Sequence, residues 1–383
     1  DMTPGRKFMS AFSMYLGLAK DVKYHADLVY YVIRYALGKF KQIIIFFDNP
    51  SVIKTVLNEF SVTVCVMKHL SNSTATMLFF LIPTVMLILG FLFFPFPLSS
   101  FQENMLLFPL FVGLILLGCG YIMEKTGSLL KTAGWIIFSF YWATQPSKLY
   151  HYEGGDVVNA VICAVGVYVL FYFAYKEWLN TQREDRPVCL NWVAGATAIA
   201  GLIYFTLDKI SFLRERLIHV VAQQSTWFLT LFSDKVMVDG DLIWFGYHYD
   251  MLQQYGSYGA TAQIIFACTA IQSMLLFIGM IGALRTAQLR LQAYALLATV
   301  PVIYVLNLIR NAGVIFLSGS QITTIYIAHH YLGKFGSLIV LIALVFIVFK
   351  ILPDLYNHIV CLFDLPRQDG PVERQLKRYL MRR

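Results

Sequence analysis

Residues 291–318 read LQAYALLATVPVIYVLNLIRNAGVIFLS, a run apolar enough and long enough to cross a membrane as one helix. A helix needs about 20 apolar residues to cross a hydrocarbon core of about 30 Å. The run also holds Arg310, and an arginine inside a membrane span is costly, so such residues usually face a polar cavity and have a function. The structural alternative is that Arg310, close to the end of the run, reaches the membrane surface with its long side chain.

The composition of the whole chain is that of an integral membrane protein. Of the 383 residues, 58% are hydrophobic and 14% are charged, whereas soluble proteins carry about 25% charged residues. The net charge of +8 does not indicate nucleic-acid binding, because no basic stripe is interleaved with aromatic residues. The surplus of Lys and Arg is instead typical of the cytoplasmic segments of membrane proteins.

Recurring apolar runs predict an all-α polytopic membrane protein with about eight transmembrane helices. The expected spans are 77–96, 105–123, 127–145, 156–175, 190–207, 261–283, 291–318 and 336–352. The N-terminal segment, the C-terminal tail and the links 176–189 and 284–290 are basic, whereas the link 97–104 has no Lys or Arg. By the positive-inside rule we therefore expect a multi-pass protein of the cell membrane with both termini in the cytoplasm.

The link between spans five and six is long and differs from the others. It holds more acidic than basic residues, begins with amphipathic helical spacing from Leu213 to Leu231, and continues with the turn-rich pattern of short strands. We interpret it as an extracytoplasmic cap; the alternative is an interfacial helix and a loop without chemistry. The expected regions are an amphipathic N-terminal segment in the cytoplasm or on the membrane surface (1–75), spans one to five (76–207), the cap (208–260), spans six to eight (261–352) and a basic cytoplasmic tail (353–383).

The six cysteines match neither the spacing of a zinc site nor a disulfide framework. They are Cys65, Cys119, Cys163, Cys189, Cys268 and Cys361. We expect most of them to pack as small hydrophobic side chains, and we expect no metal and no cofactor. Cys268 is the exception because of the residues that the topology places at its depth.

Three reactive groups are expected to meet at the outer leaflet. Span six runs inward from about residue 261, which places Cys268 about 10 Å below the outer surface, and Arg310 lies near the same level on the outward-running span seven. His329 and His330 fall in the short outer link before span eight. A cysteine nucleophile needs a nearby positive charge and a proton acceptor. A lone membrane cysteine is more often a packing residue, so the prediction depends on the three groups together.

The same residues resemble a known family. The run Ala267-Cys268-Thr269-Ala270-Ile271-Gln272-Ser273, the run Asn307-x-x-Arg310-Asn311 and the pattern His330-x-x-Gly333-Lys334 are similar to the archaeosortase/exosortase family, with the best fit to its archaeosortase A branch. The run from Ser225-Thr226 to Val238-Asp239-Gly240 also resembles what precedes the cysteine there. The resemblance covers about 190–373.

The resemblance implies a membrane cysteine transpeptidase that acts on C-terminal sorting signals of exported surface proteins. Such a signal is a short motif, a transmembrane helix and a basic tail, and the new C-terminus is passed to a lipid headgroup amine. Cys268 would be the nucleophile, Arg310 the charge stabiliser and His330 the base, with His329 as the alternative. Supporting residues would be Asn307, Asn311, Gln272 and Lys334. One departure is Ala270, where we expect glycine in many relatives.

Two rival interpretations come from other classes. In a transporter of an anionic substrate, Arg310 would bind the substrate and Cys268 would only pack. Against this, no inverted repeat of the spans is evident, and the reactive groups lie toward one face and not at the midplane. A membrane assembly factor without chemistry is the third interpretation.

Overall fold

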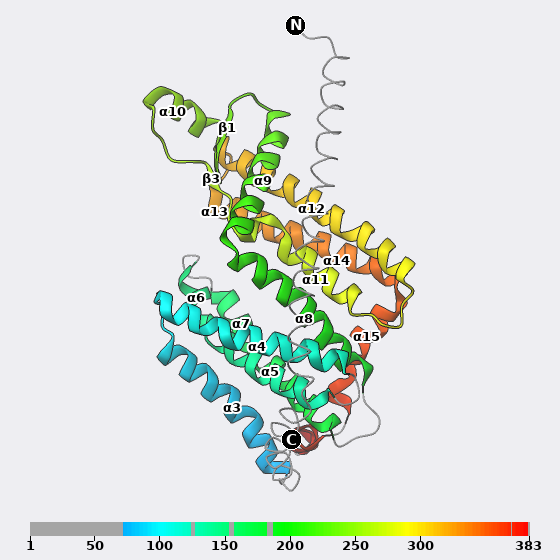
Figure 1. Cartoon of the computed structure of the whole chain (residues 1–383). Helices are drawn as coiled ribbons and strands as arrows, with labels where there is room; N and C mark the ends of the chain where they lie inside the picture. The colour runs from blue at the N-terminus through cyan, green and yellow to red at the C-terminus, as the bar shows by residue number, and fades with distance from the viewer. Residues whose placement is uncertain (1–71, 124–126, 153–156, 182–186, 369, 382–383) are drawn as a thin grey trace. The chain divides into compact units, whose positions relative to one another are not determined.

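The computed structural model describes residues 72–123, 127–152, 157–181, 187–368 and 370–381. These residues belong to one compact unit, Asn72–Arg383, and almost all of their regular structure is helical (Figure 1). The amphipathic segment expected at 1–75 lies almost entirely outside the described residues, so its structure stays a prediction.

The described part of the chain confirms a helical protein that passes the membrane several times. Its helices are α3 (Asn72–Phe93), α4 (Ser100–Ile122), α5 (Ser128–Ala143), α6 (Gln145–Tyr152), α7 (Val157–Asn180), α8 (Val188–Lys209), α9 (Ser211–Thr230), α10 (Tyr247–Tyr255), α11 (Ile271–Gly282), α12 (Leu289–Gly319), α13 (Ile325–Ile327), α14 (Lys334–Ile351), α15 (Pro353–Asp364) and α16 (Pro371–Met381).

Six segments in this part of the chain are long and apolar enough to cross a membrane: most of α3, then α4, α7, α8, α12 and the segment Ile325–Ile351. The other two expected spans are shorter, because α5 has 16 residues and α11 has 12. The count of eight therefore stays a prediction.

Helices α4, α5 and α8 form a tightly packed core. Gly113 and Gly134 allow α4 and α5 to approach closely, since a Cβ on Gly134 would lie 2.9 Å from the main-chain nitrogen of Leu117. Small residues at helix contacts allow such close packing in membrane proteins. The large side chains of this core, among them Leu114 and Trp135, are fully buried.

The region expected to form the cap is a small antiparallel sheet next to a helix. Strands β1 (Val236–Asp239), β2 (Leu242–Phe245) and β3 (Ala262–Gln263) pair in the order β1-β2-β3. The β1–β2 hairpin is closed by a two-residue turn in which Gly240 has a φ of 59°, and such turns require positive φ. In Figure 1 the strands lie beside α9 and near α13. The amphipathic helix and the short strands are as expected, and the extracytoplasmic location stays a prediction.

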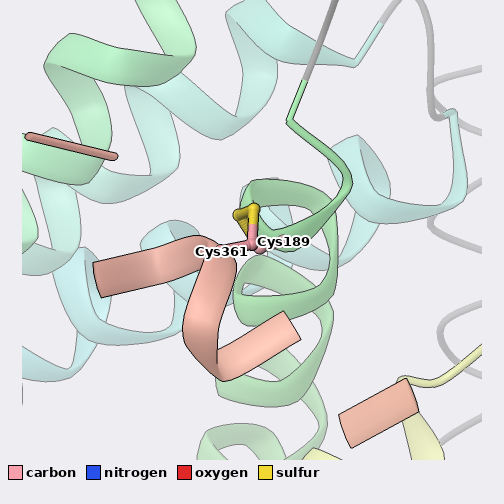
Figure 2. Close-up of a disulfide and its surroundings, with 2 residues drawn as sticks. All are labelled: Cys189 and Cys361. Atoms are coloured by element: carbon pink, nitrogen blue, oxygen red, sulfur yellow. A yellow bond between two sulfur atoms is a disulfide. The ribbon is translucent and has the colours of Figure 1, made fainter. Parts of the chain in front are cut away.

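Two cysteines that we expected to pack only as hydrophobic side chains form a disulfide. Figure 2 shows the bond between Cys189, at the start of α8, and Cys361 of α15. The two Cα atoms lie 5.9 Å apart. The bond lies among the buried residues Leu190 and Leu365. The expectation that the cysteines form no disulfide was wrong for this pair, because sequence spacing carries no information about a contact 172 residues away.

The C-terminal helix α16 is fixed to α7 by buried charges. Lys176 lies 2.6 Å from a carboxylate oxygen of Glu373, and both side chains are almost fully buried. The hydroxyls of Tyr172 and Tyr175 donate to the two oxygens of the same carboxylate at 2.8 and 3.0 Å. Buried charges are tolerated when they are paired and hydrogen-bonded, so this network secures the end of the chain against the membrane helices.

Candidate active site

Cys268 lies in a 3-10 turn that leads into α11. The turn, Phe266–Thr269, follows β3, and the helix begins only at Ile271. The Cys268 N–H donates to the carbonyl of Ile265 at 2.8 Å, and the Thr269 hydroxyl donates to the carbonyl of Phe266 at 2.7 Å. The expected start of span six at residue 261 was therefore wrong. A short apolar run has the same hydropathy as a buried strand, a turn or a helix, so hydropathy could not separate them.

Ala270 joins the turn to α11 in a left-handed conformation. Its φ of 61° and ψ of 0° are uncommon for a residue with a Cβ, whereas glycine adopts them without steric cost. The position is the one where the family resemblance led us to expect glycine. The backbone geometry supplies a physical reason for glycine there.

Two asparagines of α12 hold the main-chain carbonyl of Cys268. The side-chain amide of Asn307 donates to it at 2.7 Å, and that of Asn311 donates at 3.0 Å. The two residues lie one helical turn apart, so their side chains reach the same point. Asn307 also contacts Arg310, whose Nη1 atom donates to Oδ1 of Asn307 at 3.4 Å.

Arg310 is partly buried on the same stretch of α12. Asn307 links it to the cysteine turn, because Asn307 contacts both the Arg310 guanidinium and the Cys268 carbonyl. In the described part of the chain its Nε atom is buried without a hydrogen-bond partner. The guanidinium rests against Gly333, since a Cβ on that glycine would lie 3.0 Å from Nε and 3.5 Å from Nη2. Gly333 was noted in the sequence only as part of a motif, and its contact with Arg310 was not anticipated.

A cavity of about 340 Å³ lies between α12 and α14, and Ala270, which follows the Cys268 turn, is part of its lining. Cys268 itself is not among the residues that line it. Most of its walls are apolar, and its polar lining is Ser273, Asn307, Arg310 and Ser337. Gly313 and Gly336 also line it, and a Cβ on either would meet nothing within 4 Å. Such a cavity can hold a ligand that is mostly apolar, with a polar end that contacts the Arg310 guanidinium.

The histidines lie in a continuous helical segment and not in a loop. A π-helical turn, Ala328–Gly333, joins α13 to α14, so the link that we expected before span eight is itself helical. His329 is partly buried, and only the backbone of His330 is described. Gln272 and Lys334 are exposed and do not line the cavity. The structure therefore brings together Cys268, Asn307, Arg310 and Asn311.

The residues around Cys268 do not suggest a metal centre. Across residues 72–381, apart from the short gaps in the description, no group of three or more His, Cys, Asp or Glu side chains is placed to hold a metal ion. The chemistry of the site is that of a thiol, a guanidinium and carboxamides.

Fold and site together define a class: a multi-pass membrane protein with a cysteine turn held by asparagines beside an arginine. The chain is a distant homologue of archaeosortase A, which confirms the resemblance. It is 26% identical over 228 residues to archaeosortase A of Haloferax volcanii, over 56% of this chain and 70% of the relative. It is 26% identical over 202 residues to archaeosortase A of Natronomonas pharaonis, over 50% of this chain and 58% of the relative. No family model matches the chain, and no solved structure matches it.

Proposed function

We propose that this protein is a membrane cysteine transpeptidase of the archaeosortase type, with Cys268 as its nucleophile. One observation carries the proposal: the carbonyl of Cys268 accepts hydrogen bonds from both Asn307 and Asn311, on the helix that also presents Arg310. A cysteine that only packs needs no such support from two buried or partly buried amides. A nucleophile does, because its sulfur must be held in one orientation for attack.

The position of the sulfur also suits a thiolate. Cys268 lies three positions before the first residue of α11, whose first main-chain hydrogen bond runs from the N–H of Met274 to the carbonyl of Ala270. The N–H groups of the first helical turn therefore point back toward the cysteine turn. A helix N-terminus and a guanidinium are surroundings in which reactive cysteines are commonly found.

The proposed reaction consists of two acyl transfers. The thiolate attacks the scissile carbonyl carbon, a C–S bond forms, the C–N bond breaks, and a histidine protonates the departing amine. An acceptor amine then attacks the thioester, gives a proton to the histidine and releases the thiolate. His330 is the proposed base, with His329 as the alternative. Arg310 donates to the oxyanion of each tetrahedral intermediate, a role for which one donor is typically worth about 10²–10³-fold in rate.

The proposed substrates are surface proteins that end in a sorting motif, a transmembrane helix and a basic tail. The proposed acceptor is a lipid headgroup amine, and the site is proposed to face the extracytoplasmic leaflet. The homology to archaeosortase A supports this substrate class. The cavity supports it as well, since it has apolar walls between two membrane helices and is lined by Arg310 and by Ala270, two residues after Cys268.

The test is the processing of such a substrate in cells, followed as a change in electrophoretic mobility. We expect Cys268→Ala and Cys268→Ser to abolish processing. Cys163→Ala is the matched control, because Cys163 is a buried free cysteine in α7 far along the chain from the site. Full processing by Cys268→Ala would contradict the proposed cysteine mechanism.

A further inference from the structure

The cavity between α12 and α14 is long and narrow. Its lining residues recur at helical spacing on α12 from Ile303 to Leu317, and they run from Ala328 to Leu341 on the π-helical turn and α14. The distance along α12 from the first to the last of them is about 21 Å, whereas the volume is about 340 Å³. One turn of a helix 10 Å wide already occupies about 420 Å³. The cavity therefore suits a flexible chain and cannot enclose a transmembrane helix.

The cavity reaches the side of the molecule. Two of its lining residues, Ile309 of α12 and Leu332 of the π-helical turn, are 48% and 55% exposed. Lipid tails are as apolar as leucine side chains, so we expect these exposed residues of the membrane helices to face lipid. A lipid chain can then enter the cavity sideways between the two helices.

The polar lining of the cavity favours an anionic group. Arg310 is the only charged residue among the described residues that line it, so no carboxylate competes for the guanidinium there. Ser337 donates its hydroxyl to the carbonyl of Gly333 at 2.8 Å, and the amide of Asn307 is bonded to the carbonyl of Cys268. Arg310 has five N–H donors, of which one on Nη1 bonds to Asn307. The other Nη hydrogens can bind the oxygens of a phosphate, for which arginine is well suited.

The apolar walls argue against a peptide that fills the length of the cavity. An extended peptide about 20 Å long has about six residues, and each of its N–H and C=O groups needs a partner when it is buried. The described walls offer polar side chains only at Ser273, Asn307, Arg310 and Ser337. A hydrocarbon chain has no polar groups to satisfy, so it fits the apolar parts of the walls.

We propose that this cavity binds one hydrocarbon chain of a phospholipid whose phosphate contacts Arg310, and that Gly313 and Gly336 set the width of the passage. A Cβ on either glycine would meet nothing within 4 Å, so both positions face open space. The inference rests on the proposed function, in which a lipid headgroup amine is the acceptor. A guanidinium has enough donors to hold a phosphate oxygen and the oxyanion together.

The experiment is photo-crosslinking of a defined lipid to the full-length protein in nanodiscs. The probe is phosphatidylethanolamine with a diazirine in one acyl chain, and the crosslinked residues are mapped by mass spectrometry. We expect the adducts to concentrate on residues 303–317 and 328–341. The same chain on diacylglycerol, which lacks the phosphate, should label these residues about tenfold less, as for the loss of one charge-assisted pair. Free phosphoethanolamine at equal concentration should not compete, because it has no chain.

Variants of the two glycines test the passage itself. Gly313→Phe places a ring in the cavity and leaves Arg310 in place, so labelling of the cavity residues should be lost. Val305→Phe is the matched control, because Val305 is an exposed residue of α12 that does not line the cavity. Gly336→Leu blocks the passage from α14 and serves if Gly313→Phe fails to fold. In Arg310→Gln, labelling by the phospholipid should fall to the level of diacylglycerol.

Unchanged labelling in Gly313→Phe and Gly336→Leu, both shown to be folded by thermal unfolding, would overturn the inference. Equal labelling by the two lipids, or adducts spread evenly over exposed helices such as α3, would overturn it as well. The labelling needs no catalysis and is repeated in Cys268→Ser, where the same pattern is expected. If Cys268→Ala still processes a sorting-signal protein, the proposed function fails, whatever the pattern of lipid labelling.

Discussion

The amide of Asn307 donates a 2.7 Å hydrogen bond to the main-chain carbonyl of Cys268, 39 positions earlier in the chain. This bond, with the second one from Asn311, fixes the turn before α11 to the helix that carries Arg310. The proposed nucleophile and the proposed charge stabiliser are therefore joined through one stretch of α12, residues 307–311. Their relative placement does not depend on a loop.

Replacement of Asn307 tests whether the link between the Cys268 turn and α12 matters for stability and activity. Asn307→Ala removes one donor, and the loss of one hydrogen bond should lower stability by about 1 kcal/mol. Asn307→Asp should be worse, because a carboxylate repels the Cys268 carbonyl and draws Arg310 away from the sulfur. The readouts are thermal unfolding and the rate of peptide cleavage. Equal rates for the Asp variant and the wild type would show that the bond has no catalytic role.

Gly333 should matter for activity through Arg310. A Cβ at this position would lie 3.0 Å from Nε of Arg310, so Gly333→Ala must displace the guanidinium. We expect a rate about 10-fold to 100-fold lower, as for a loss of alignment between reacting groups. Gly336→Ala is the matched control, since its Cβ would meet nothing within 4 Å. If both variants cleave a sorting peptide equally well, the close contact between Gly333 and the Arg310 guanidinium is not required for activity.

The role of Arg310 can be separated into charge and geometry. If it presents two donors to an oxyanion, Arg310→Lys should be nearly as inactive as Arg310→Ala, because a point charge cannot reproduce the planar fork. We expect this outcome. Single-turnover acylation is compared with the alkylation rate of Cys268. Near wild-type acylation by the Lys variant would contradict the oxyanion role and indicate an effect on the thiolate alone.

Ala270→Gly should stabilise the protein. A left-handed residue with a Cβ costs about 1–2 kcal/mol, and glycine removes this cost while it adds disorder to the unfolded chain. We expect a net gain of up to about 1 kcal/mol, measured as a rise in the melting temperature. The control is Ala295→Gly in the buried interior of α12, which should destabilise by about 1 kcal/mol. A lower melting temperature for Ala270→Gly would mean that the left-handed turn is not strained.

Much of the architecture could be predicted from the sequence. Long apolar runs define the membrane helices α4, α7, α8 and α12 because their length and hydropathy are set by the bilayer. The sequence also predicted that Arg310 and Cys268 lie at one depth, and the structure links both residues to Asn307. Part of the reasoning was wrong, because Cys268 lies in a turn before α11 and not two turns along a helix. These inferences depend on properties of single segments.

The features that could not be predicted from the sequence depend on contacts between distant segments. The start of α11 at Ile271 is set by the turn that holds Cys268. Hydropathy does not reveal such a turn, because its residues are as apolar as those of a helix. The contact of Asn311 with the Cys268 carbonyl and the bond between Cys189 and Cys361 join parts of the chain that no local pattern relates. The close contact of Gly333 with the Arg310 guanidinium also joins two parts of the chain that no local pattern relates.

The most direct test of the account is to trap the acyl-enzyme. The purified protein is mixed with a synthetic sorting peptide without an acceptor amine, quenched in acid and analysed by intact mass and peptide mapping. We expect a mass increase equal to the acyl part of the peptide, carried by Cys268, released by hydroxylamine and absent from Cys268→Ser. Cleavage of the peptide by the wild type with no adduct on Cys268, or cleavage that persists in Cys268→Ser, would contradict it.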